Sequence, residues 1–463
     1  MSSLSRKQAS TDEQPERELA ALFPASFVFG TSTSAYQIEG AVDEDGRGDS
    51  IWDTFSRTPG KTNRGQSGAV ACDHYHRFRE DIRLMAELGL SAYRFSIAWP
   101  RIIPDGTGAV NQKGLDFYDS LVDHLLANGI EPFPTLYHWD LPQTLEDRGG
   151  WRSRATADAF EPYAEAVVRR LGDRVSNWIT LNEPWVQAWH GYAEGVHAPG
   201  SAGGPAGAIP VSHHLLLAHG KAVAVIRSLA PSSRVGITLD LAPSYPASDS
   251  PADEQAAREA DGRRNRWFLD PVLRGHYPGD MVDLLALLPD GAESDMAAVA
   301  APTDFLGINY YSRMVISARS DGPQSRDDGV PRTDAGWEIF PKGLNQLLLR
   351  VTQEYGVESI YVTENGAAYA DGPNGTRDVA DIRRQEYLVG HFQAAAAAIA
   401  SGAKLDGYFV WSFLDNFEWA QAYDDKFRFG IVYVDFDDQT RTVKDSAKWY
   451  SALIDSHKRF WAE

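Results

Sequence analysis

Cysteine is nearly absent from this 463-residue chain, whose only one is Cys72. A single cysteine forms no intramolecular disulfide, so the sequence does not imply an oxidising compartment. Residues 72–76 combine cysteine, aspartate and histidine, which are metal-binding residue types, but no second cysteine pair could close a tetrahedral site. We therefore expect a packed polar segment at the start of a helix there, with no metal and no cofactor.

Basic residues are in the minority. The 44 Lys and Arg residues against 64 Asp and Glu residues give a formal net charge of −20. An acidic surface repels nucleic acid and anionic membranes, so neither is expected as a partner. A neutral or cationic substrate fits this charge better than a phosphorylated one.

Long apolar runs are missing as well. No stretch has enough consecutive apolar residues to cross a bilayer, and residues 1–24 lack the apolar core of a signal peptide. These 24 residues are rich in Ser, Gln, Asp and Glu, and we expect a flexible N-terminal tail. The expected location of the protein is the cytoplasm.

What the chain does contain is a regular alternation of β-rich and amphipathic helical runs, within an ordinary globular composition. Eight strands are predicted, at 27–30, 92–96, 131–137, 177–181, 235–239, 305–310, 360–363 and 407–411. Helices are predicted at 78–88, 115–127, 156–171, 214–229, 343–355, 384–400 and 446–456. Strands separated by helices indicate parallel βα units.

Such units form either an open doubly wound sheet or a closed barrel. An open nucleotide-binding sheet would carry a glycine-rich turn after its first strand, and residues 30–37 have no G-x-G-x-x-G spacing. We therefore predict one α/β domain over residues 25–463, a single (β/α)₈ TIM barrel, with exposed loops at 200–207 and 320–329. In this fold, chemistry is located at the carboxyl ends of the strands.

Two glutamates stand at such strand ends. Glu183 follows the strand 177–181 and precedes Pro184, while Glu364 follows the strand 360–363 and is close to Gly366. A glutamate at a buried barrel rim is unfavourable unless it is paired or functional, and a salt bridge or a helix cap is the structural alternative for each. Together they match the two carboxylates of glycoside hydrolysis, and their separation would decide between retention and inversion.

Seven segments, in the order of the family, give the chain a resemblance to glycoside hydrolase family 1, the β-glucosidase family, from about residue 27 to residue 450. They are residues 29–40 (FGTSTSAYQIEG), 93–97 (YRFSI), 138–142 (HWDLP), 182–184 (NEP), 307–311 (GINYY), 363–366 (TENG) and 411–419 (WSFLDNFEW). The resemblance implies a retaining enzyme with Glu364 as nucleophile, Glu183 as acid/base, and Arg94 and Tyr311 in contact with the nucleophile. Such an enzyme needs its two carboxyl groups about 5 Å apart.

The resemblance also assigns the sugar contacts. It implies hydroxyl contacts from polar side chains, stacking from Trp411, an indole N–H contact from Trp419, and a leaving-group contact from Trp337; the polar side chains are Gln37, His138, Asn182, Asn309, Tyr311 and Glu418. Asn182 is the expected partner of the 2-hydroxyl. Taken alone, His138 would be a structural histidine, and tryptophans are core residues by default.

The expected substrates are small β-glucosides and cello-oligosaccharides such as cellobiose. Glu418 would repel a 6-phosphate, and the resemblance implies an O-glycosidase because Glu183 is not replaced by glutamine. The chain departs from the family by an insertion within 422–429, so either Phe427 or Phe429 could line the site. Alternatives are a transglycosylating enzyme, a preference for β-galactosides or β-fucosides, a metal hydrolase and a non-enzymatic sugar-binding barrel. The oligomeric state is not indicated.

Overall fold

The computed structural model describes residues 14–319, 323–324, 329–373 and 378–462. Its centre is a closed ring of eight strands in the order β1-β11-β10-β7-β5-β4-β3-β2, with every neighbouring pair parallel. The strands are β1 (Val28–Ser32), β2 (Ala92–Ser96), β3 (Glu131–Tyr137), β4 (Asn177–Asn182), β5 (Arg234–Asp240), β7 (Phe305–Asn309), β10 (Ile360–Asn365) and β11 (Leu405–Trp411). The predicted (β/α)₈ barrel is confirmed.

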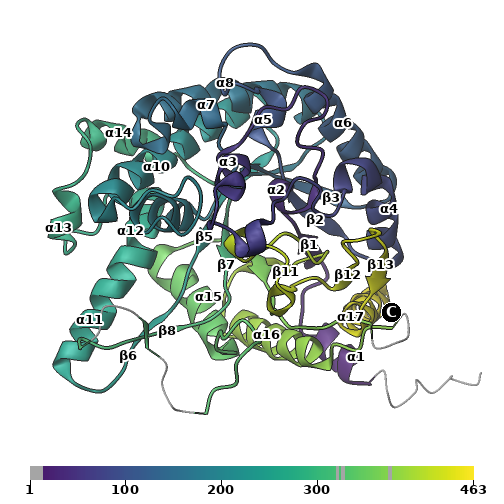
Figure 1. Cartoon of the computed structure of the whole chain (residues 1–463). Helices are drawn as coiled ribbons and strands as arrows, with labels where there is room; N and C mark the ends of the chain where they lie inside the picture. Colours follow the sequence, from purple (N-terminus) through teal and green to yellow (C-terminus); the bar gives the residue numbers. More distant parts are fainter. Residues whose placement is uncertain (1–13, 320–322, 325–328, 374–377, 463) are drawn as a thin grey trace, which may run out of the picture.

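Helices surround this ring (Figure 1). The long ones are α4 (His74–Glu87), α6 (Gln112–Ala127), α8 (Arg154–Leu171), α10 (Gly204–Leu229), α15 (Pro341–Tyr355), α16 (Ile382–Ala400) and α17 (Asp445–Ala462). Each turns an apolar stripe toward the sheet, which is the pattern that predicted it.

Shorter elements occupy the connections. The helical ones are α1 (Gln14–Ala20), α2 (Ala35–Ile38), α3 (Ile51–Arg57), η2 (Asn63–Gly65), α5 (Trp99–Ile102), α7 (Gln143–Glu146), η3 (Gly150–Arg152), α9 (Pro184–Val186), η4 (Gln187–Ala193), α11 (Pro251–Asp261), η5 (Gly262–Arg266), α12 (Trp267–Arg274), α13 (Val282–Leu285), α14 (Ala292–Val299), η6 (Trp419–Gln421) and η7 (Asp425–Phe427). Two small sheets consist of β12 (Val432–Val434) with β13 (Arg441–Val443), and of β6 (Ser244–Pro246), β8 (Met314–Ile316) and β9 (Pro323–Gln324).

Side chains fill the interior of the barrel, which is therefore a packed core and not a pore. One buried cluster takes a residue from each of six strands: Ala92, Phe133, Ile179, Phe305, Tyr361 and Phe409. Gly30 makes room for it, because a Cβ at this position would lie 2.5 Å from the Phe409 ring. This cluster, called the barrel floor below, packs under the polar residues at the carboxyl ends of the strands.

The helix α10 corrects one expectation, the exposed loop at 200–207. It begins at Gly204, inside the predicted loop 200–207, because Pro205 lies in the first turn, where the missing N–H is tolerated. By length and mean hydropathy (1.2) alone it resembles a membrane-spanning helix. However, 78% of its apolar window is buried inside the protein, where it packs against α8.

The predicted flexible tail over 1–24 is wrong from residue 14 onward. Residues 14–20 form α1, and Phe23 is buried against Phe27 and Phe29. The Trp461 indole of α17 donates to the Phe23 carbonyl (3.0 Å). A few apolar side chains thus anchor an otherwise polar segment. The remainder, residues 1–13, and most of the predicted loop 320–329 lie outside the described residues.

Candidate active site

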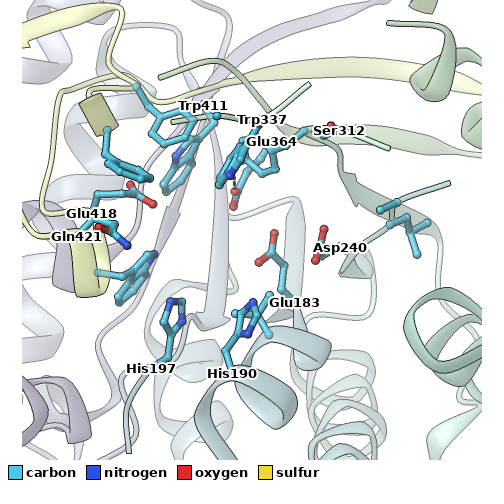
Figure 2. Close-up of a pocket in the computed structure, with 18 of the residues that line it drawn as sticks. Glu183, His190, His197, Asp240, Ser312, Trp337, Glu364, Trp411, Glu418 and Gln421 are labelled. Carbon is cyan, nitrogen blue, oxygen red and sulfur yellow. Dashed lines mark hydrogen bonds between the residues drawn. The ribbon is translucent and has the colours of Figure 1, made fainter. Parts of the chain in front are cut away.

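Glu183 and Glu364 lie in one cavity at the carboxyl end of the barrel. Glu183 directly follows β4, and Glu364 belongs to β10. Both side chains are buried, and both line a cavity of about 700 Å³. In Figure 2 their carboxylates point into the same space. The fold therefore brings together two carboxylates that are far apart in the sequence.

The backbone holds Glu183 firmly. Its φ of 47° is left-handed, a conformation that residues with side chains adopt only where their surroundings enforce it. The Glu183 N–H donates to the Thr238 carbonyl of β5 (3.0 Å), and Pro184 begins α9 immediately afterwards. The carboxylate is thus fixed from both sides of the chain.

Glu364 is held by two donors. The Arg94 guanidinium lies 2.5 Å from Glu364 Oε1, and the Tyr311 hydroxyl donates to Oε2 (2.7 Å). Arg94 is completely buried, and its other terminal nitrogen donates to Asn182 Oδ1 (2.6 Å). A buried carboxylate with an ionic partner and a hydroxyl donor is stabilised in its charged form.

Burial raises the pKa of Glu364 above its ordinary value, while Arg94, Tyr311 and Asn309 oppose the rise. In the structure the loss of water around the carboxylate is the larger effect, and the donors limit its consequence.

Glu183 has a different environment. Its Oε1 accepts from the Asn309 amide (2.6 Å), a neutral donor. Burial raises the pKa of Glu183 well above its ordinary value, and the negative charges of Asp240 and Glu364 raise it further. Loss of solvent and two nearby carboxylates favour the protonated acid, which is the form that a general acid needs.

An amide network joins these groups. Asn309 also donates to Asn182 Oδ1 (3.1 Å), and the Thr363 hydroxyl donates to Asn309 Oδ1 (2.7 Å). Asn182 in turn donates to His138 Nε2 (3.0 Å), so this ring nitrogen is an acceptor. Burial lowers the pKa of His138 well below its usual value, and Arg94 adds to this. His138 is therefore a neutral imidazole.

A second polar cluster lies on another side of the cavity. Gln37 donates to Glu418 Oε2 (3.2 Å) and accepts from the Ser34 hydroxyl at its own Oε1 (2.6 Å). Burial raises the pKa of Glu418 to about 8, with Glu364 adding to the rise and Gln37 opposing it. Glu418 is thus protonated more readily than an ordinary carboxyl group.

Aromatic rings form the walls between these polar clusters. The Trp411 and Trp419 rings stack near His138, with centroid distances of 6.1 and 5.9 Å. Trp337 is 37% exposed at the mouth and packs on Phe429 (5.7 Å). Flat rings of this kind suit the apolar C–H faces of a sugar.

The cavity separates the predicted residues into two groups. Those that line it are Glu183, Glu364, His138, Tyr311, Trp337, Trp411, Glu418 and Trp419. The others are each hydrogen-bonded to one lining group: Arg94 to Glu364, Gln37 to Glu418, Asn182 to His138 and Asn309 to Glu183. Both Phe427 and Phe429 line the cavity, so the insertion contributes two aromatic residues where one was expected.

Several lining residues are absent from the predicted site, notably Asp240, Arg264, His190, His197 and Glu338. Asp240 is the last residue of β5, so the rule that places chemistry at strand ends points to it. Arg264 lies on a π-helical turn, which has no regular sequence signature.

In the part of the chain that the structure describes, no three His, Cys, Asp or Glu side chains are grouped in a way that could hold a metal ion. His74 instead bonds Asp81 (2.7 Å), and the Cys72 thiol lies 3.0 Å from the Asp415 carbonyl. Residues 72–76 are thus a packed polar segment at the start of α4.

Comparison with known proteins supports the same interpretation. A family profile described as "Glycosyl hydrolase family 1" matches residues 19–459. The chain is 46% identical to Beta-glucosidase A of Acetivibrio thermocellus over 444 residues, 93% of this chain and 98% of the relative. It is 46% identical to a 1,4-beta-D-glucan glucohydrolase of Thermotoga neapolitana, over 93% and 98% of the two chains.

Among solved structures, the β-glucosidase of Thermotoga maritima in complex with glucoimidazole is similar with a TM-score of 0.91 and 47% identity, covering 94% of this chain and 99% of that one. These matches confirm the predicted β-glucosidase class, a hydrolase of O-glycosyl bonds. The chain belongs to glycosyl hydrolase family 1.

Proposed function

We propose that this β-glucosidase releases terminal non-reducing β-D-glucosyl residues with retention of configuration, using Glu364 as nucleophile and Glu183 as acid/base. The observation that carries the assignment is the unequal environment of the two carboxyl groups. Glu364 contacts a guanidinium and a phenol hydroxyl, whereas Glu183 contacts a neutral amide near the negative charge of Asp240. The first environment suits a carboxylate and the second a carboxylic acid.

In the first step, a Glu364 oxygen attacks the anomeric carbon while the bond to the leaving oxygen breaks. Glu183 gives its proton to that oxygen, so the product leaves as an alcohol. The Arg94 and Tyr311 donors keep Glu364 ionised and oriented before the attack. The intermediate is a glucosyl ester of Glu364.

Esterification removes the negative charge of Glu364, which is one of the causes of the raised pKa of Glu183. The pKa of Glu183 therefore falls in the intermediate, and the residue acts as a base. It takes a proton from water, whose oxygen attacks the anomeric carbon and releases Glu364. Two inversions at one carbon give net retention.

We further propose small β-glucosides, cellobiose and cello-oligosaccharides as substrates. Glu418, Gln37, His138 and Asn182 would contact the glucosyl hydroxyls, and Asn182 is the proposed partner of the 2-hydroxyl. Glu418 accepts from the neutral Gln37 amide, and its ionised form would repel a 6-phosphate. Transfer to an alcohol, or a preference for β-galactosides or β-fucosides, would use the same residues.

The decisive test hydrolyses a panel of aryl β-glycosides and follows the products by NMR. The expected result is the β-anomer of glucose as the first product, followed by slow mutarotation. A first-formed α-anomer would contradict double displacement. Added alcohol acceptors reveal the share of transfer, and galactosides and fucosides in the same panel reveal sugar preference.

The cytoplasmic location stays a prediction. The buried free thiol of Cys72 is compatible with it. Activity measured in separated cytoplasmic and extracellular fractions of the source organism tests it.

A further inference from the structure

The cavity continues past the two glutamates to a charged pair that makes and breaks no bond in the proposed mechanism. Asp240 ends β5, and its Oδ2 accepts from the Arg264 guanidinium. Both residues line the cavity. In Figure 2, Asp240 lies on one side of Glu183 and Glu364, and Glu418 lies on the opposite side. If the glucosyl ring occupies the Glu418 side, the pair faces the leaving group.

The pair is held rigidly. In the strand register Asp240 is opposite Asn309, the residue that bonds Glu183. The Arg264 guanidinium stacks 3.9 Å above the Trp185 ring. The neighbouring Asn265 fixes the strand end, because its side chain bonds both the N–H (3.1 Å) and the carbonyl (2.8 Å) of Ala242. The position of the two charges therefore does not depend on a bound ligand.

Each member of the pair retains unused hydrogen-bonding capacity. Within the described residues, no donor contacts Asp240 Oδ1, and no acceptor contacts Arg264 Nη1, since the bond to Asp240 uses Nη2. A charged acceptor and a charged donor side by side are complementary to neighbouring hydroxyls, each of which both donates and accepts. A leaving group without hydroxyls would leave both capacities unused.

We propose that Asp240 and Arg264 form a leaving-group subsite that selects hydroxylated leaving groups, a second sugar unit above all. This inference rests on the proposed function, since it takes Glu183 as the acid next to the leaving oxygen. Asp240 has a specificity role, in addition to the effect of its charge on Glu183.

The experiment compares cellobiose with 2,2,2-trifluoroethyl β-glucoside. Both release weakly acidic alcohols that need protonation by Glu183, but only cellobiose offers hydroxyls to the pair. Asp240→Ala is expected to lower the ratio of kcat/KM for cellobiose to that for the trifluoroethyl glucoside about 10- to 100-fold, the range for a lost charged hydrogen bond. Values are taken at the maximum of each pH profile, so that a changed pKa of Glu183 affects both substrates alike.

Asp283→Ala is the matched control, because Asp283 forms an exposed pair with Arg263 next to the same turn. Its ratio should equal that of the wild type. Arg264→Lys retains a cation for Asp240 but removes the second terminal nitrogen, Nη1, and should lower the ratio as well. If Asp240→Ala does not fold, Asp240→Asn replaces it, because it keeps the size of the side chain and turns an acceptor into a donor.

An unchanged ratio, or an equal loss on both substrates, would overturn the subsite and leave Asp240 with an effect on Glu183 or on folding alone. Failure of the proposed function is a different result, because the wild-type enzyme would then hydrolyse neither glucoside.

Discussion

Arg94 and Glu364 form an ion pair of 2.5 Å in which neither side chain has appreciable contact with solvent. Breaking such a pair leaves a buried charge without compensation, which is costly. Arg94 also bonds Asn182, so one guanidinium positions both the proposed nucleophile and the proposed 2-hydroxyl contact.

Replacing Arg94 by lysine keeps the charge but cannot reproduce the two-pronged contact. We expect kcat/KM for an aryl β-glucoside to fall about 10- to 100-fold, the effect of losing one charged hydrogen bond. The control is Arg83→Lys on the exposed face of α4, where 68% of the side chain is accessible. Activity of Arg94→Lys within threefold of the wild type would show that one donor is enough.

The variant Glu364→Ala should lose at least about 10⁴-fold in kcat, because the nucleophile is gone. Added azide should restore part of the activity and yield the α-glucosyl azide, since a single displacement inverts the configuration. NMR of the azide product checks this outcome.

The matched variant Glu183→Ala lacks the acid instead. It should form the glucosyl ester rapidly from substrates with good leaving groups, and azide should then give the β-glucosyl azide. The same azide anomer from both variants would refute the assignment of the two roles.

The dependence of kcat/KM on pH should be bell-shaped. Glu364 reacts as a carboxylate, so activity is lost as the pH falls through its pKa, which burial raises. Glu183 reacts as an acid, so activity is lost as the pH rises through its pKa, which burial and two carboxylates raise. Because both pKa values are raised, the pH range of activity should lie above the range expected for two ordinary carboxyl groups.

Tyr311→Phe removes a hydrogen bond that stabilises the carboxylate form of Glu364 (2.7 Å). The pKa of Glu364 should therefore rise, and the acid limb should move about 0.5 to 1 unit toward higher pH. The basic limb should move less. A pH profile with an unchanged acid limb would separate Tyr311 from the ionisation of Glu364.

Phe133 carries the stability of the barrel floor, because its buried ring packs on Phe409 (4.9 Å) and Tyr361 (5.4 Å). Phe133→Ala should lower the free energy of unfolding by about 3–5 kcal/mol. Urea unfolding measures the change. Leu126→Ala, on a residue that is 40% exposed, should change it by less than about 1 kcal/mol.

Strand positions were predictable from the sequence because the barrel strands are apolar on both faces and separated by amphipathic helices. Strand ends were less predictable. The structure extends β1 to Ser32 and β10 to Asn365, beyond the predicted ends. Polar residues at an active site interrupt the apolar pattern from which strand ends are inferred.

The two glutamates could be located because each ends an apolar strand at a turn. Other residues of the site do not stand in such a sequence pattern. Asp240 follows the same strand-end rule, but its partner Arg264 lies more than twenty residues later on a π-helical turn, and only the fold joins them. Asn309 can be recognised as a positioning residue only from its hydrogen bond to Glu183 in the structure.

Closure of the strand ring has a consequence for how this enzyme could diversify. Glu183, Glu364 and Asp240 stand at strand ends that backbone hydrogen bonds hold within the ring, whereas Arg264 lies in the connection that follows β5. Insertions or exchanges in that connection can therefore alter which alcohol is released while bond cleavage itself stays intact. Mutant libraries confined to residues 241–266 should therefore change which leaving groups the enzyme accepts while the catalytic residues stay unchanged.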